Sequence, residues 1–192
     1  MLDSAVVLLR ERGAAGVTID AVLAHSGAPR GSVYHHFPDG RSELVLAAAG
    51  QAGDHIAAVL DRAVRDTDPA TALERFVRFW QQALSTTEFT AGCPIVAVAV
   101  DGPQHTSGAA DLVRDVFTRW QDNLSQLLIA HHHPPERARR LATLAISAVE
   151  GAIILCRAHR HTAPLDDVLT ELAPLLRAPH AGDLRSEGAA RP

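Results

Sequence analysis

Lysine is absent from this sequence of 192 residues, and cysteine and aromatic residues are scarce. Because all 18 basic residues are arginine, every cationic contact must use a guanidinium group, which is suited to bidentate recognition. The two cysteines, Cys93 and Cys156, lie far apart and form no CxxC pair. Their spacing argues against a zinc ribbon and against a secreted domain stapled by disulfides.

Long apolar runs are also missing. The sequence has no stretch of about 18 apolar residues and no basic N-terminal region followed by an apolar core, so we expect a cytoplasmic protein that does not enter a membrane. It contains no GxSxG, HExxH or phosphate-binding loop, so we expect no enzyme, no cofactor and no metal site. The net charge of −4 does not by itself indicate a nucleic-acid partner.

Apolar residues at helical spacing predict an all-α chain with no convincing sheet. Hydrophobic residues make up 47% of the sequence and aromatic residues 4%, a balance typical of helical bundles. The alternation within 94–102 also fits a strand, but we assign a short helix because its neighbours are helical. The expected helices cover about 3–12, 18–26, 29–36, 41–65, 68–85, 94–102, 107–131, 135–160 and 164–177.

Residues 18–36 form two short predicted helices joined by a tight glycine turn, which is the helix-turn-helix arrangement. Thr18 is a suitable N-cap for the first, and Gly27 can end it in the left-handed conformation. In the second, Val33 and Phe37 lie on one side and would anchor it to the preceding helices. The residues left facing outward or at the flanks are Arg30, Gly31, Ser32, Tyr34, His35 and His36.

This outward face suits DNA. An arginine near the start of the helix can reach guanine O6 and N7 in the major groove, and Gly31 lets the backbone approach closely. Ser32, Tyr34 and His36 suit phosphate contacts, which position a helix without reading sequence. The competing interpretation is a solvated corner, because residues 1–47 carry four arginines against five acidic residues. Nonspecific DNA binding should therefore be weak.

The stretch GVTIDAVLAHSGAPRGSVYHHFPDGRSEL resembles the DNA-binding signature of TetR/AcrR-family repressors. The shared features are a Thr that opens the second helix, a Gly in the turn, a Tyr-x-His-Phe that ends the third helix, and a basic residue followed by Leu. The match covers residues 3–49. The extra residue in FPDGR and the later AGCPIVAVAVD are similar to the LmrA/YxaF-like branch of this family.

The resemblance implies roles for individual residues. It places Thr18 beside a phosphate, and it places Arg41 where the family usually has a lysine at the start of the fourth helix. It assigns base or backbone contacts to Arg30, Gly31 and Ser32, and phosphate contacts to Tyr34 and His36. Two departures stand out: the basic arm common before the first helix is missing, and the inserted residue before Arg41 alters the geometry of that contact.

The resemblance also implies an all-helical effector-binding and dimerisation domain. We expect a helix-turn-helix domain at 1–47, this larger domain at 48–178 and a tail without regular structure at 179–192. Two helices from each subunit would form a four-helix dimer interface, so that two recognition helices enter successive major grooves of a palindromic operator, roughly 34–36 Å apart. The expected interface residues are Ala148, Gly151, Ala152, Leu155, Leu165, Leu169 and Leu172.

A ligand pocket should lie between the connector helix at 41–65 and the dimer interface. The candidate lining residues are Phe76, Trp80, Cys93, Phe117, Trp120 and Cys156, although aromatic residues at helical spacing more often belong to the core. We expect an apolar or aromatic small molecule as the effector. By favouring a connector orientation that does not fit DNA, the effector would release a regulator that usually acts as a repressor in this family.

Three alternatives stay open. His131–His133, together with His159 and His161, could sense a metal, although adjacent histidines on a helix point in different directions and a solvated helix end fits them better. Cys93 could sense oxidants if its thiol were exposed and its pKa lowered. The chain could also be a helical interaction module whose DNA site has lapsed, which the acidic balance of residues 1–47 fits.

Overall fold

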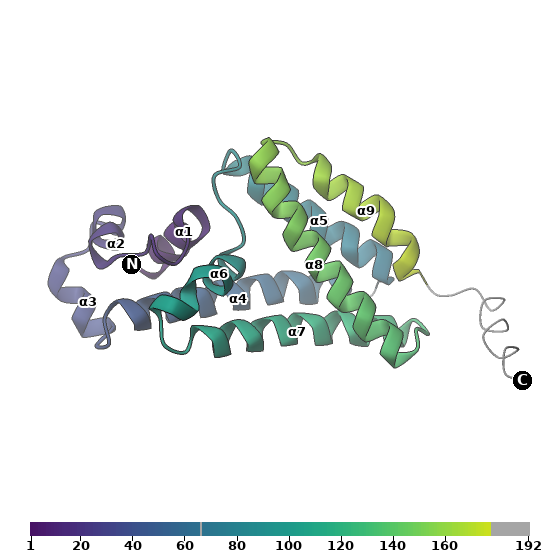
Figure 1. Ribbon diagram of the computed structural model, residues 1–192, viewed down its shortest axis with the longest axis horizontal. Helices are drawn as coiled ribbons and strands as arrows, with labels where there is room; N and C mark the ends of the chain where they lie inside the picture. The colour runs from purple at the N-terminus through teal and green to yellow at the C-terminus, as the bar shows by residue number, and fades with distance from the viewer. Residues whose placement is uncertain (66, 178–192) are drawn as a thin grey trace, which may run out of the picture.

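The computed structural model describes residues 1–65 and 67–177, and within these ranges every regular element is an α-helix (Figure 1). The all-helical prediction is confirmed, and the ambiguous segment after Cys93 is helical. The tail expected at 179–192 lies outside the described residues. The helices are α1 (Leu2–Arg12), α2 (Ile19–Ser26), α3 (Arg30–His36), α4 (Arg41–Val64), α5 (Pro69–Thr86), α6 (Pro94–His105), α7 (Ala109–Ala130), α8 (Pro135–His159) and α9 (Ala163–Leu176).

The first three helices form a small group at one end of α4 (Figure 1). α2 begins where Thr18 Oγ1 accepts a hydrogen bond from Ala21 N at 3.1 Å, and it ends at Gly27, whose φ of 68° is left-handed. Val33, on the inner side of α3, is fully buried, and Phe37, directly after this helix, is partly buried. Local sequence therefore builds the turn and anchors α3, as the spacing of these residues predicts.

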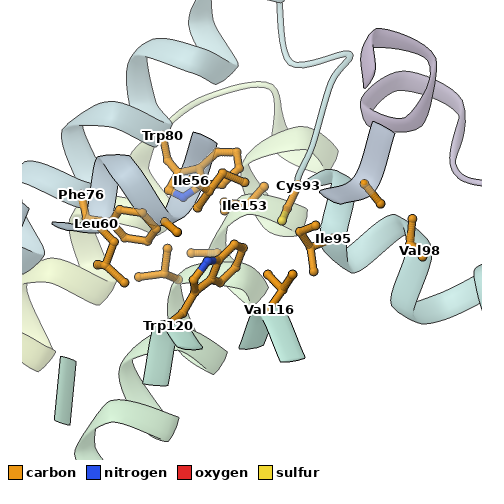
Figure 2. Packing of buried hydrophobic residues seen from close by; sticks show 14 of the residues in the cluster. Ile56, Leu60, Phe76, Trp80, Cys93, Ile95, Val98, Val116, Trp120 and Ile153 are labelled. Carbon is orange, nitrogen blue, oxygen red and sulfur yellow. The ribbon is translucent and has the colours of Figure 1, made fainter. Parts of the chain in front are cut away.

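The larger part is a stack of helices around one hydrophobic core. α4 and α7 lie side by side, and α5, α8 and α9 pack above them (Figure 1). Trp80 of α5 and Trp120 of α7 are almost inaccessible to solvent, with Ile56, Leu60 and Phe76 close to them (Figure 2). These large side chains bury the apolar faces of α4, α5 and α7 together.

Hydrogen bonds join the first three helices to the larger part. Gly92 N donates to Arg10 O at 2.8 Å, and Arg10 Nε donates to Gly92 O at 3.3 Å. Asp101 of α6 accepts from Ala14 N at 3.3 Å and from Ala15 N at 2.9 Å, in the connection between α1 and α2. We call these hydrogen bonds the interdomain contacts.

The guanidinium group of Arg41, at the start of α4, adds to the interdomain contacts. Its Nε donates to Val17 O at 2.7 Å and its Nη2 to Ala14 O at 2.5 Å. Its Nη1 donates to Thr106 Oγ1 at 3.5 Å, at the end of α6. Arg41 therefore ties the α1–α2 connection to α4 and α6. Residue 47, where the sequence suggests a domain boundary, lies inside the continuous helix α4.

α4 and α7 approach each other most closely near Gly53. A Cβ added at Gly53 would lie 2.9 Å from Val116 Cγ2 and 3.3 Å from its Cγ1. A Cβ added at Gly50, one turn earlier on the same helix, would lie 4.0 Å from Leu112 Cδ1, which is ordinary contact. The two glycines therefore have different packing constraints on the same face.

We expect Gly53→Ala to lower the free energy of unfolding by about 1 kcal/mol, because the buried, β-branched Val116 cannot move away easily. Gly50→Ala is the matched control, and it should raise that free energy by up to about 1 kcal/mol because alanine favours the helix. Urea unfolding of both variants measures the difference. Equal stabilities would contradict a close approach of α4 and α7 at Gly53.

Candidate DNA interface and ligand cavity

The outward face of α3 presents polar residues to solvent. The exposed residues of this helix are Arg30, Gly31, Tyr34, His35 and His36. The side chain of Tyr34 stands out, with 58% of the residue exposed. A Cβ on Gly31 would have no described atom within 4 Å, so the backbone there is open to a close partner. Ser32 is partly buried, and its hydroxyl donates to Pro29 O at 2.6 Å.

Arg30 forms an ion pair with Asp20 of α2. The two side chains are 68% and 76% exposed, so water surrounds the pair and it contributes roughly 0–1 kcal/mol. A guanine edge or a phosphate can therefore replace Asp20 at small cost. Sequence reasoning missed this partner, for which the signal is an acidic residue in the first turn of the helix before α3.

Thr18 and Arg41 occupy different surroundings. Thr18 is exposed at the start of α2, where its hydroxyl caps the helix. Arg41 is partly buried, and its hydrogen bonds to Val17 O and Ala14 O direct the guanidinium group toward the protein backbone. The structure thus brings Thr18 to the surface with α3, while it gives Arg41 a role in holding the α1–α2 connection.

A narrow cavity of about 20 Å³ lies between α4, α5, α7 and α8. This volume accommodates about one water molecule. Two residues expected at a ligand site, Phe76 and Trp120, line it together with Leu60, Leu124 and Val149. Glu150 also lines this cavity, and its carboxyl group is the one ionisable group among the described lining residues. We call this space the Glu150 cavity.

Glu150 is only 8% exposed, and its Oε2 has no hydrogen-bond partner among the described residues. The thiol of Cys93, at the start of α6, lies close enough to the carboxyl group to favour its charged form and lower its pKa. Burial nonetheless raises the pKa of Glu150 to about 7, because the charged form loses its hydration. Burial also raises the pKa of the Cys93 thiol well above its usual range, and the charge of Glu150 adds to that shift.

Sequence reasoning missed Glu150 as a site residue. It is the sole charged residue of the sequence between Leu141 and Cys156. Acidic side chains are almost never fully buried unless they are paired. A lone carboxylate inside an apolar helical stretch was therefore an available signal for a special environment.

A larger cavity of about 280 Å³ lies where α1 meets α4 and α5. Its lining includes Arg10, His55, Phe79 and Trp80, so it borders the interdomain contacts. Trp80 is thus placed at this second cavity. Its indole N–H is buried and unpaired within the described ranges of the chain.

Two expected ligand residues, Phe117 and Cys156, line neither cavity. Phe117 is partly buried and packs edge-on against Trp120, with 5.4 Å between the ring centroids. Cys156 is fully buried under α9. Cys93 is also buried, and its thiol lies near the carboxyl group of Glu150, a residue that lines the Glu150 cavity.

The expected solvation of the three adjacent histidines is wrong for His133. This residue is 2% exposed, and its Nε2 lies 3.1 Å from Leu176 O at the end of α9. The Nε2 of His131 lies 3.2 Å from Thr67 O. The turn after α7 directs these two rings to separate backbone partners. Among residues 1–65 and 67–177, no group of three His, Cys, Asp or Glu side chains could hold a metal ion.

α8 is long and apolar enough to cross a membrane by length and composition. In the folded subunit, however, α8 packs against α7 and α9, and it buries Leu141, Ala145, Val149 and Ile153 in the core. A core helix of this kind passes the same compositional test as a spanning helix. Packing within the chain therefore accounts for part of the apolar character of α8, while Leu144, Ile154 and Leu155 of the same helix are exposed.

The helical fold with an exposed α3 defines a helix-turn-helix DNA-binding regulator. Residues 1–48 match the family described as bacterial regulatory proteins, tetR family. Residues 69–171 match the family described as transcriptional regulator LmrA/YxaF-like, C-terminal domain. The chain belongs to the TetR family, and its resemblance to the LmrA/YxaF-like branch is confirmed.

Individual relatives agree with this assignment. An HTH-type transcriptional regulator of Mycobacterium tuberculosis is 44% identical over 183 residues, which cover 93% of each chain. The HTH-type transcriptional regulator LmrA of Bacillus subtilis is 25% identical over 178 residues, which cover 92% of this chain and 95% of LmrA. The crystal structure of a regulatory protein TetR from Rhodobacter sphaeroides shares the fold, with a TM-score of 0.81 at 22% identity over 90% of this chain and 95% of that one.

The raised pKa of Glu150 makes stability depend on pH. Because the folded protein holds this proton more tightly than the unfolded chain, the associated stability is complete below pH 4.5 and is lost as pH rises through about 7. The loss from this group should reach about 3 kcal/mol. We therefore expect Glu150→Gln to be more stable than the wild type at about pH 8, with little difference at about pH 5.

Chemical denaturation of both proteins across this pH range measures the effect. Glu136→Gln, a change at an exposed position of the same helix, serves as the control and should follow the wild-type curve. Parallel curves for the wild type and Glu150→Gln would contradict the raised pKa.

Proposed function

We propose that this regulator binds a palindromic operator as a homodimer, that it acts as a repressor in the cytoplasm, and that a small molecule bound in its larger helical part releases it. The observation that carries the proposal is the outward face of α3, together with the hydrogen bonds that join the α1–α2 connection, just before the helix-turn-helix, to the part that contains the two cavities. Regulators of the TetR family bind DNA and dimerise. A ligand that favours a second packing of the larger part would change the position of α3.

The proposed DNA contacts follow from exposure and chemistry. Arg30 leaves Asp20 to bond a guanine edge in the major groove, and Gly31 lets the backbone come close. Tyr34, His36 and Thr18 contact phosphates. His35 and Ser32 lie at the edges of the contact. Arg41 contributes by holding the backbone before α2 in place.

The proposed dimer interface lies on α8 and α9. The apolar residues exposed there are Leu144, Ile154, Leu155 and Leu175, each between 42% and 55% exposed. A Cβ on Gly151 would meet no described atom within 4 Å, so a partner helix can approach. Ala148 and Leu169 are partly buried at the border of this surface.

Three residues expected at the interface are already covered within the subunit: Ala152, Leu165 and Leu172 are 2%, 0% and 5% exposed. They support the interface from behind by packing α8 against α9. Compared with the interface expected from the sequence, the exposed apolar surface includes Ile154 as well as Leu155. Leu155 was expected there from the sequence, whereas Ile154 was not.

The rival functions receive less support. The raised pKa and burial of Cys93 disfavour a thiolate that reacts with oxidants. The separate partners of His131 and His133 disfavour a shared metal. Membership of a DNA-binding family disfavours an interaction module that has lost DNA binding.

We expect Arg30→Ala to relax sequence preference at one symmetric base position of the operator, because the lost bidentate pair discriminates by about 1–3 kcal/mol. Selection from random double-stranded DNA, at a stated salt concentration, measures the preference of each variant. The control is Arg78→Ala, which removes an exposed arginine of α5 that pairs with Glu74. An unchanged operator motif for Arg30→Ala would show that Arg30 reads no base.

We expect the double change Ile154→Arg and Leu155→Arg to produce monomers, because it places charges in the centre of the apolar interface. Loss of the dimer should also remove binding to a two-half-site operator. Sedimentation at micromolar concentration measures the mass of the particle. Val100→Arg, at an apolar residue of α6 that is 74% exposed, is the control and should leave the mass unchanged. A dimer that survives the double change would place the interface elsewhere.

A further inference from the structure

Two residues that line the Glu150 cavity carry polar groups without a hydrogen-bond partner among the described residues. Glu150 Oε2 and the indole N–H of Trp120 are both buried, and neither finds a hydrogen-bond partner in the described part of the chain. Buried polar groups in native proteins are nearly always bonded, so such groups call for a partner from outside the chain. One water molecule fits the cavity and can bond the carboxyl group, but water cannot neutralise its charge.

The chemistry of the walls indicates which partner can do so. A carboxylate in an apolar surrounding is stabilised by an opposite charge, and a neighbouring anion would raise its free energy further. Phe76 and Trp120 add aromatic rings, which attract a cation through their π-electrons. Leu60, Leu124 and Val149 provide apolar contact. The complementary ligand is therefore a positive group on an apolar body.

We propose that the effector of this regulator is an amphipathic cation, an apolar or aromatic molecule with a protonated amine, and that its amine pairs with Glu150. This inference rests on the proposed function, since it assigns a chemical class to the ligand that releases DNA. It narrows the apolar or aromatic effector expected from the sequence to molecules that carry a positive charge.

The narrowness of the cavity links binding to a change in packing. At about 20 Å³ it admits an amine with an apolar body only after lining side chains from α5, α7 or α8 move. A ligand that needs a different packing binds that packing better, which is the condition for shifting a population. The packing described here, with its cavity of about 20 Å³, is then the one that the effector disfavours.

Glu150 lies next to the segment between α5 and α6, which is hydrogen-bonded to α1. Its neighbour Cys93 follows Gly92 directly in the chain, and Gly92 N donates a hydrogen bond to Arg10 O at 2.8 Å. An amine that draws the carboxylate away from Cys93 alters the contacts at the start of α6 and, through Gly92, the support of α1.

A second residue of α8, Arg157, also contacts the segment between α5 and α6. Arg157 Nη2 donates to Thr90 O at 2.9 Å, and a Cβ on Gly92 would lie 2.9 Å from Arg157 Nη1. Movement of α8 around a bound ligand is thus transmitted to the segment that contacts α1. Figure 2 shows Cys93, just before α6 begins, and Ile153 of α8 in the same buried cluster.

Protons compete with the amine for Glu150. The groups that face the carboxyl are the Cys93 thiol from α6 and uncharged side chains from α4, α5, α7 and α8. With a pKa of about 7, the carboxyl group is mostly neutral at about pH 6 and mostly ionised at about pH 8. The affinity for an amine should therefore rise about tenfold between these values, while that for a neutral analogue stays constant.

The test compares phenylethylamine with phenylethanol, which differ in the charged group, by calorimetric titration of the full-length protein at about pH 8. The wild type should bind the amine at least about tenfold more tightly than the alcohol. Glu150→Gln should remove this preference by weakening the amine alone, and Glu136→Gln, exposed on the same helix, should preserve it. Repeating the wild-type titration at about pH 6 gives a readout that needs no variant.

Several results would overturn the inference. These are equal affinities of the wild type for amine and alcohol, an amine preference that survives in Glu150→Gln, an amine affinity that is the same at both pH values, and binding of neither probe. An operator fragment from the selection experiment, added to the same titrations, separates the two proposals. Release of DNA by the alcohol as readily as by the amine would overturn the cationic class and leave a ligand-responsive regulator. Amine binding that depends on Glu150 but releases no DNA would support the cation site and contradict ligand-controlled release.

Discussion

The position of α3 depends on how the backbone between α1 and α2 is hydrogen-bonded. Asp101 accepts from the amides of Ala14 and Ala15, while Arg41 donates to the carbonyls of Ala14 and Val17. A carboxylate and a guanidinium group from the larger part thus satisfy donors and acceptors of the same connection. Together with the packing of α1 against α4 and α6, these hydrogen bonds orient the three short helices relative to the larger part.

The core of the larger part combines dense apolar packing with one group that opposes it. Trp80 and Trp120 bury large surfaces, whereas Glu150 is destabilising once its carboxyl group ionises. Local violations of core rules concentrate at functional sites. Here the exception is the buried carboxyl group of Glu150. It lies close to Cys93, and the preceding residue, Gly92, is hydrogen-bonded to Arg10 of α1. The buried carboxyl group that destabilises the core when it ionises is therefore close to the hydrogen bond between Gly92 and Arg10 of α1.

Much of the fold was predictable because its signals are local. Apolar spacing located all nine described helices, and the Thr18 cap and Gly27 turn placed α3. The family resemblance was readable from the same residues. The prediction for His133 was wrong because the turn after α7 brings the ring under the end of α9, which adjacent sequence does not reveal. The expected contacts of α3 with DNA remain predictions.

The sequence by itself determined helix periodicity, capping and family, since these depend on residues within a few turns of one another. Tertiary structure decided which groups meet across the chain. It paired Arg30 with Asp20, directed Arg41 to the α1–α2 backbone, buried Leu165 and Leu172 within the subunit, and left a carboxyl oxygen of Glu150 in an apolar cavity. Those outcomes depend on how helices distant in sequence pack, because packing sets the burial and the partners of each polar group.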